Sequence, residues 1–319
     1  MNNQFGEYSK ELSAVAVNYK NEGYIVNEIA PQVPVASSSF SYVVWNKDNS
    51  LSVPETAISR TSKANEVDFS ASRTPATVTD HALSHLISKK DIDEYDSANL
   101  GVGLLEASVA ESLTGIMQLR KELEAAKTIQ NAAKYAASNV KCYGVGDSWT
   151  SDESDPLADI EDATEAGVVA YNRLWFAQDS WVRFRRHPKV IARFYSGATT
   201  NRSVRAEMVA EELGLEKIVI GATKVITSLP GKTATTGRVW SATAGLYLFE
   251  QPCGASAART FAFDAYLPNN GQKLAVFKTD VIPTEAGTRG GVRVAVAEDS
   301  VTVISAPDFG YLFKNVLAV

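Results

Sequence analysis

The chain has 319 residues, of which 45% are hydrophobic and 21% charged, and its formal net charge is −6. This length is enough for about two domains, and the composition excludes a disordered, collagen-like or membrane protein. The acidic balance argues against a protein that binds nucleic acid through many phosphate contacts, so any contact with DNA would be local and weak.

The N-terminus, MNNQFGEYSK, lacks the basic and then apolar order of a signal peptide, and no apolar run approaches about 20 residues. We therefore expect a protein that folds in a cytoplasm without membrane contact. Cys142 and Cys253 have no CxxC spacing, so reduced thiols are expected, with a disulfide between them as the alternative.

Residues 1–38 are polar with scattered apolar side chains, and they include Pro31 and Pro34, which cannot donate to a sheet ladder. The apolar residues between 24 and 35 argue against a disordered tail. This pattern predicts an extended arm that lies on another surface.

Residues 39–79 show two runs with the period of two that is typical of strands, separated by a long polar connection. The alternating apolar residues are Phe40, Tyr42 and Val44 in the first run and Val67, Phe69 and Ala71 in the second. An isolated hairpin is marginally stable in water. We therefore expect this ribbon to lie on a neighbouring subunit.

Residues 98–138 form one long helical pattern, in which apolar residues recur every three or four positions. Asp96 and Ser97 are the predicted N-caps. An unbroken helix of this length would span about 60 Å, which suits a rod through an extended subunit. The glycines at 101, 103 and 115 are the points where the helix could be split.

Residues 139–156 are rich in Gly, Ser and Asp and predict a break, after which a second unit alternates helix and strand. Asp155 and Pro156 predict the start of a helix. Asp179 or Ser180 is the predicted cap of a short helix that follows the strand RLWFA.

The rest of the second unit is predicted to turn from helix to strand. The segment RSVRAEMVAEEL predicts an amphipathic helix that ends at Gly214, and KIVIG predicts a short buried strand. From Lys224 onward, the segments VWSATAGLYLF, KLAVFKTDVI, GVRVAVA and SVTVIS are rich in β-branched and aromatic residues and predict strands.

Basic side chains gather just after residue 180. They are Arg183, Arg185, Arg186, Lys189 and Arg193. One interpretation is a patch that faces DNA or an acidic neighbour. The other, which we favour, is the solvated face of a short helix whose core side carries Trp181 and Phe184.

No motif predicts catalysis. Gly231, Lys232 and Thr233 resemble the end of a phosphate-binding P-loop, but Ile226 stands where the motif needs its first glycine, so a turn is favoured. His81 and His85 lie four apart without a further ligand nearby. We expect no enzyme activity, no cofactor and no metal site.

The order of an arm, a projecting hairpin, a rod helix and a second lobe resembles the tailed-phage major capsid proteins of the Hong Kong 97 fold. The amino-acid sequences of several segments are similar to that family as well. These segments are GYIVNEIAPQVPVASSSFSYVVWNKDN, PETAISRTSKANEVDFSAS, DIDEYDSANLGVGLLEASVAESLTGIMQLRKELEAAK and NRLWFAQDSWVRFRRHPKVIARF. The first two resemble the arm and the extended loop, or E-loop; the third resembles the spine helix; the last resembles part of the axial domain.

The resemblance implies an α+β fold with four parts. They are an N-terminal arm (1–38), an E-loop (39–79), a peripheral domain with the spine helix (80–150 and 271–301) and an α/β axial domain (151–270 and 302–319). Residues Phe40, Tyr42, Trp45, Val67 and Phe69 of the E-loop would contact a neighbouring subunit.

The resemblance further implies self-assembly into hexamers and pentamers of an icosahedral phage head, made in the host cytoplasm and present in the virion. Double-stranded DNA would be enclosed with weak, non-specific contact. The portal, a scaffolding protein and a decoration protein are the other expected partners. Because fewer than about 40 residues precede the hairpin, we expect the scaffold to be separate, unless a longer precursor is cleaved.

Two alternatives remain open. The first is an encapsulin, a cellular nanocompartment of the same fold that encloses a cargo enzyme. The second is a nucleotide-binding enzyme that uses residues 231–233, for which the sequence gives little support. Packaged DNA, protein cargo or ATP binding would discriminate between the three functions.

Overall fold

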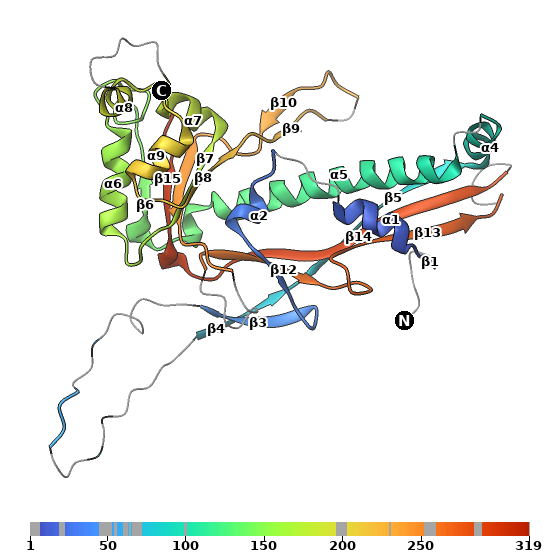
Figure 1. Cartoon of the computed structure of the whole chain (residues 1–319), viewed down its shortest axis with the longest axis horizontal. Coiled ribbons are helices and arrows are strands. Elements are labelled where there is room, and N and C mark those ends of the chain that lie inside the picture. Colours follow the sequence, from blue (N-terminus) through green and yellow to red (C-terminus); the bar gives the residue numbers. More distant parts are fainter. Residues whose placement is uncertain are drawn as a thin grey trace.

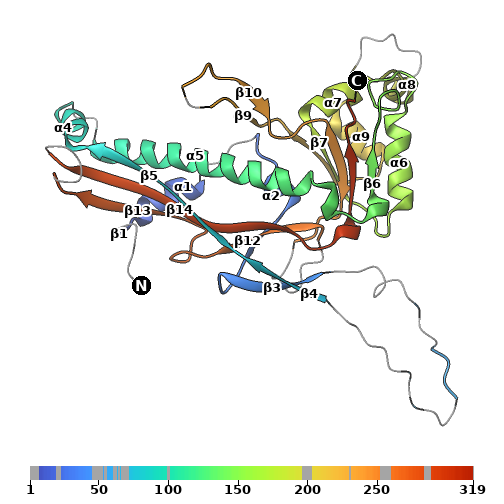
Figure 2. The same cartoon turned by 180° about the vertical axis from the view of Figure 1, so that it is seen from behind.

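The computed structural model shows an elongated α+β chain with a long slab at one end of the molecule and a compact lobe at the other (Figure 1). It describes residues 7–18, 23–44, 72–98, 101–195, 203–229, 231–251, 260–283 and 289–318, and positions 53, 56–59, 63 and 65. The same two-part arrangement is seen from behind in Figure 2.

The slab is a sheet built around one long strand, β14 (Gly291–Ile304). Neighbours run in the order β1 (Glu7–Tyr8), β13 (Leu274–Val281), β14, β12 (Ala262–Leu267) and β2 (Gln32–Pro34), and β5 (Thr79–Ser88) also pairs with β14. All these pairings are antiparallel except that of β2 with β12. The segments GVRVAVA and SVTVIS, predicted as two strands, are therefore both parts of β14.

The predicted rod helix is α5 (Val102–Ile129), which lies along the slab (Figure 1). Its 28 residues span about 42 Å, so the prediction of a longer helix is wrong at both ends. Gly101 at φ +79° separates it from α4 (Lys89–Ser97), because that conformation favours glycine. Asp96 and Ser97 lie inside α4 and cap nothing in α5. Two 3-10 turns, η1 (Ala132–Lys134) and η2 (Ala137–Asn139), follow the helix.

The compact lobe contains a mixed five-stranded sheet. Its order is β6 (Val140–Cys142), β15 (Gly310–Lys314), β11 (Thr243–Tyr247), β7 (Arg173–Ala177) and β8 (Lys217–Gly221). Every residue of β7 and β11 is buried, as expected for central strands. One face packs on an aromatic cluster that includes Trp149, Phe176 and Phe184.

Four helices accompany this sheet: α6 (Pro156–Ala166), α7 (Gln178–Phe184), α8 (Pro188–Phe194) and α9 (Ala206–Glu212). The predicted start of α6 is confirmed, since the Asp155 carboxylate accepts the Ala158 N–H at 3.2 Å. The predicted cap of α7 is wrong, because Ala177 occupies the N-cap. Asp179 instead lies in the first turn and accepts the backbone N–H of Ala242.

Two hairpins project from the body (Figure 1). The first pairs β3 (Ser39–Val44) with β4 (Ser72–Thr77), from Ser39 opposite Thr77 to Val44 opposite Ser72. The strand predicted around Val67, Phe69 and Ala71 lies outside the described residues, and the return strand that is described follows it. The second hairpin pairs β9 (Lys224–Ile226) with β10 (Thr236–Arg238).

The predicted domain bounds separate β12 and β6 from the sheets in which they pair, and they also cut β14 after residue 301. β12 falls in the predicted axial domain but pairs with β14 in the slab, and β6 falls in the predicted peripheral domain but pairs with β15 in the lobe. A strand shares its stability with the sheet whose hydrogen bonds it completes. We therefore propose domain bounds that follow the sheets, which moves β12 to the peripheral domain and β6 to the axial domain.

Candidate functional site: assembly surfaces and their anchors

The base of the first hairpin is fastened to the chain's own slab. Tyr42 is only 8% exposed and meets the ring of Phe263 edge-on at 5.7 Å, while burial raises the pKa of its hydroxyl. Val33 and Val78 pack in the same cluster. Tyr42 therefore anchors the hairpin inside its own chain, and its predicted contact with a neighbouring subunit stays a prediction. Phe40 is half-buried beside it, at 6.4 Å between ring centres.

Trp45, Val67 and Phe69, the other three predicted E-loop contacts, lie outside the described residues. Their role between subunits stays a prediction. One observation supports this role: β3 and β4 pair with each other and with no other described strand.

Residues 23–35, here called the strap, connect the slab to the compact lobe. The strap contains the single turn α2 (Val26–Ile29) and β2, and three of its apolar side chains, Ile25, Ile29 and Val33, are at most 3% exposed. The arm predicted to lie on another surface therefore lies, over these residues, on its own chain.

Glu122 of α5 holds the strap through a buried carboxylate. It accepts the backbone N–H groups of Ile25 and Val26, both at 3.0 Å, and the indole N–H of Trp240 at 2.6 Å. Burial raises the pKa of Glu122, and these three hydrogen bonds oppose that rise by stabilising the ionised form. One side chain of the spine helix thus holds both the strap and Trp240, which lies just before β11 of the lobe sheet.

The neighbouring residue, Lys121, enters a buried charge cluster between α5 and the slab. Its ammonium group contacts the Asp264 carboxylate and lies 3.6 Å from Glu298, and Lys273 lies 3.5 Å from each of these carboxylates. The side chains of Asp264 and Glu298 are 1% and 3% exposed. Buried charges persist only when paired in this way, so the cluster fixes how α5 sits on β12 and β14.

The two lysines of this cluster respond differently to their surroundings. Burial, and then the positive charge of Lys121, lower the pKa of Lys273 to about 8. For Lys121 burial also favours the neutral form, but the Asp264 and Glu298 carboxylates outweigh it and raise the pKa. Lys273 is therefore the first of the pair to lose its proton as the pH rises.

This order predicts a pH dependence of stability. The folded chain releases the Lys273 proton near pH 8, whereas the unfolded chain keeps it up to about 10.5, so Lys273 contributes a rise in stability across that window. The Lys273→Met variant lacks this rise. Between pH 8 and 10.5 the free energy of unfolding of the wild type should therefore increase relative to that of the variant. Denaturant titrations at several pH values measure it; parallel curves for the two proteins would contradict it.

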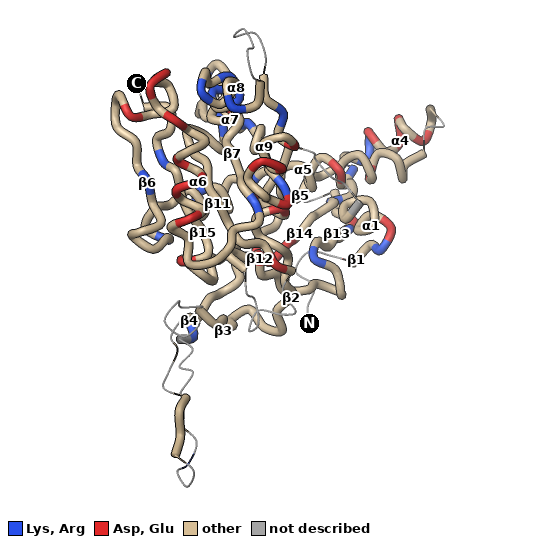
Figure 3. Tube along the Cα trace, turned by 60° about the vertical axis from the view of Figure 1, so that its left-hand side comes forward, with Lys and Arg blue, Asp and Glu red and all other residues tan. Residues whose placement is uncertain are grey.

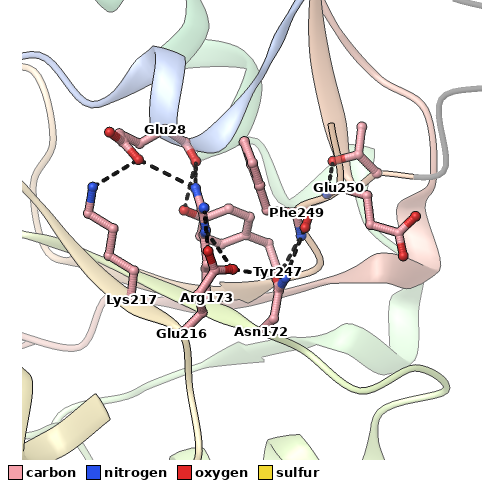
Figure 4. Close-up of polar contacts among 9 residues, drawn as sticks. Glu28, Asn172, Arg173, Glu216, Lys217, Tyr247, Phe249 and Glu250 are labelled. Atoms are coloured by element: carbon pink, nitrogen blue, oxygen red, sulfur yellow. Dashed lines mark hydrogen bonds and ion pairs between the residues drawn. The ribbon is translucent and has the colours of Figure 1, made fainter. Parts of the chain in front are cut away.

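Arg173 of β7 joins the strap to the lobe sheet (Figure 4). Its guanidinium donates to both oxygens of Glu216, at 2.9 and 3.3 Å, and to the backbone carbonyl of Glu28 at 3.3 Å. Its central carbon lies 3.7 Å from the ring centre of Phe249, and Tyr247 donates its hydroxyl to the same Glu28 carbonyl at 3.0 Å. This planar, stacked geometry is one that lysine does not reproduce.

Replacement of Arg173 by lysine is therefore expected to lower the free energy of unfolding by about 1–3 kcal/mol, since a buried charge loses its two-point contact to Glu216 and its stacking. Lys217→Gln is the matched control, because Lys217 makes a more exposed ion pair with the same Glu28 at 3.0 Å and is expected to cost under about 1 kcal/mol. Chemical denaturation measures both. Equal losses would refute the special role of Arg173.

Some side chains of the predicted basic patch are held by hydrogen bonds within the chain (Figure 3 shows the basic segments at α7 and α8 in blue). Arg183 donates to the backbone carbonyls of Trp149 and Thr150, and Lys189 to that of Glu153. Both therefore hold the loop that precedes α6. For Arg185 and Arg186 no ion pair is found among the described residues. Contact of this patch with DNA or a neighbour stays a prediction.

The described residues offer little for other chemistry. They contain no group of three or more His, Cys, Asp or Glu side chains that could hold a metal ion, and none of their helices has the length and apolarity to cross a membrane. Gly231, Lys232 and Thr233 are exposed between β9 and β10, which are paired strands with no helix after the turn. That layout does not support a P-loop.

Comparison with solved structures identifies the fold. A phage-related protein of Bordetella bronchiseptica RB50 matches with a TM-score of 0.77 at 23% identity and 98% coverage of both chains. The putative capsid protein of a prophage of E. coli CFT073 matches with a TM-score of 0.60 at 12% identity, over 96% of this chain and 98% of that one. The SrpI encapsulin of Synechococcus elongatus PCC 7942 is more distant, with a TM-score of 0.52 at 11% identity over 92% and 88%. The chain has the Hong Kong 97-type capsid fold, as predicted.

Comparison with proteins of assigned function distinguishes between the roles that proteins of this fold have. No protein-family profile matches the chain. The major capsid protein of Pseudomonas phage JBD67 is 29% identical over 308 residues, which cover 97% of this chain and 96% of that protein. That of Burkholderia phage BcepMu is 24% identical over 217 residues, or 66% and 67%. Over nearly its whole length the chain is thus similar to major capsid proteins of phages, and this is the function that the comparisons support.

Proposed function

We propose that the chain assembles into hexamers and pentamers, which close into an icosahedral phage head around double-stranded DNA. The observation that carries this proposal is the hairpin of β3 and β4, which extends from the slab as a two-stranded sheet of its own (Figure 1). A ribbon of this kind gains little stability in an isolated subunit, and its unpaired strand edges are suited to contact with a second copy.

The proposal also covers catalysis, location and partners. The chain has no catalytic task, assembles in the host cytoplasm and is carried in the virion. Its partners are further copies of itself, a portal, a scaffolding protein and in some heads a decoration protein. Contact with DNA is weak and non-specific, in keeping with a net charge of −6.

The test is electron microscopy of the purified chain at high concentration, with and without the scaffolding protein of the same phage. Closed shells, tubes or rings of five or six subunits support the proposal. Monomers under both conditions contradict it. An encapsulin-type compartment is the second candidate, because that fold also matches, and particles purified from cells decide between them: nucleic acid inside supports the phage head, and a single protein cargo supports the compartment.

A further inference from the structure

One face of the hairpin of β9 and β10 carries positive charge without a counter-charge. The pairing register places Arg238 directly opposite Lys224, and Thr236 directly opposite Ile226. All four side chains are exposed, whereas Val225 and Gly237, on the other face, are half-buried, and Val225 packs on the core. The outward face therefore presents two adjacent cations beside an apolar side chain.

No described residue around the hairpin neutralises these cations through an ion pair. Between Glu216 and Glu250 the sequence contains no acidic residue. Within the described part of the chain, no ion pair involves Lys224, Lys232 or Arg238. Like charges directly opposite each other destabilise an antiparallel pair. Such a pair on an exposed ribbon is accounted for if an anionic group from another molecule lies over it.

The apolar residues of the same hairpin indicate that the partner is a protein. Ile226 is 63% exposed and Leu229 is 68% exposed, so two large apolar side chains stand in solvent beside the cations. A phosphate backbone would neutralise the charges but would leave this apolar area uncovered. An acidic protein surface with apolar neighbours would satisfy both.

An acidic surface lies on the opposite side of the compact lobe, on α6. Asp162 and Glu165 are three residues apart on α6, so they share one helix face, and both are exposed without an ion pair in the described structure. Val145, in the loop before α6, is 78% exposed. Figures 1 and 2 agree that α6 and the β9–β10 hairpin are on opposite sides of the lobe, and Figure 3 shows the acidic residues along α6.

We infer that the hairpin of β9 and β10 contacts the α6 face of the next copy of this chain in a ring. Lys224 and Arg238 of one subunit then meet Asp162 and Glu165 of its neighbour. A contact between two different patches on opposite sides of a subunit is heterologous, and such contacts close into rings when the rotation allows. The inference rests on the proposed assembly into hexamers and pentamers and specifies which surfaces make the ring.

Charge reversal tests this contact in the full-length chain. Lys224→Glu with Arg238→Glu is expected to prevent ring and shell formation, and so is Asp162→Lys with Glu165→Lys. The chain that carries all four changes is expected to assemble again, because every interface regains opposite charges. All changed side chains are exposed, so circular dichroism should show folded protein in each case.

A mixture of the two reversed proteins gives a sharper readout. Each fails alone, but each offers the other a complementary surface, so they can alternate around a ring. Alternation closes a ring of six and not a ring of five. Electron microscopy of the mixture should therefore show hexamers, tubes or flat sheets without pentamers or closed shells.

The control reverses another exposed acidic pair, with Asp93→Lys and Glu94→Lys on α4, where the carboxylates form ion pairs with Lys89 and Lys90. This pair is expected not to restore assembly when combined with the reversed hairpin. If the wild type assembles and the fourfold variant does not, or if the α4 changes restore assembly in place of the α6 changes, the inference is wrong and the proposed function stands. Failure of the wild type to assemble counts against the proposed function itself. If the hairpin variant assembles normally but the subunit loses salt-dependent DNA binding, the partner is nucleic acid, and the inference is likewise overturned.

Discussion

Replacement of Glu122 by alanine is expected to lower the free energy of unfolding by about 3–5 kcal/mol. The change leaves three donors without an acceptor: the backbone N–H groups of Ile25 and Val26 and the indole N–H of Trp240. Each unsatisfied buried donor costs about 1–3 kcal/mol, and the truncated side chain adds a cavity in a fully buried site. Chemical denaturation of the unassembled subunit measures the loss.

Two variants separate the hydrogen bonds from the packing. Glu122→Gln keeps the shape but places an amide N–H₂ against donors, so an intermediate loss of about 1–3 kcal/mol is expected. Trp240→Phe removes one donor and leaves the two contacts to the strap. If Glu122→Ala proved as stable as Glu122→Gln, the carboxylate would not be the anchor that the geometry indicates. Limited proteolysis near residue 24 should detect release of the strap in the alanine variant.

The strap affects the position of the projecting hairpin as well as the stability of the subunit, because it leads directly into that hairpin. Only four residues separate the end of β2 at Pro34 from the start of β3 at Ser39. Tyr42, packed on Phe263, fixes the other side of that connection. The direction in which the hairpin leaves the slab is thus set by contacts inside one chain.

Most elements of the fold follow from local signals in the sequence. Asp155 and Pro156 predicted the start of α6, since a carboxylate cap followed by proline is a local device. The alternation at Phe40, Tyr42 and Val44 predicted β3. The destination of the buried Tyr42 side chain could not be predicted in this way, because it depends on Phe263, more than two hundred residues away.

The spine helix shows where periodicity alone misleads. Ile116 is one of the apolar positions that recur along this helix in the sequence, yet it is 55% exposed. The buried face runs through Ala110, Met117, Lys121 and Ala125. A sequence signal for this face exists, since Lys121 lies four residues from both Met117 and Ala125. A lysine in a buried stripe requires a carboxylate partner, but its identity, Asp264, depends on how β12 packs.

The second large effect is expected at that partner. Asp264→Ala should lower the free energy of unfolding by about 3–5 kcal/mol, because it leaves Lys121 and Lys273 buried with Glu298 as their remaining carboxylate in this cluster. Asp264 also accepts a hydrogen bond from Thr302 at 3.3 Å, so β12 and β14 lose a side-chain link in the same step. The measurement is denaturation of the unassembled subunit at neutral pH.

A double-mutant cycle tells whether the loss comes from an unpaired charge or from packing. If the unpaired Lys121 ammonium is the cause, Lys121→Met in the Asp264→Ala background should recover part of the stability, since it removes the charge that the first change stranded. Additive losses would mean that the two side chains act independently, which their direct contact argues against. Recovery would also show that the charge pair does not supply net stability by itself. Its contribution would then be to fix the position of α5 on the slab, because only one placement brings Lys121 to Asp264 and Glu122 to the strap at the same time.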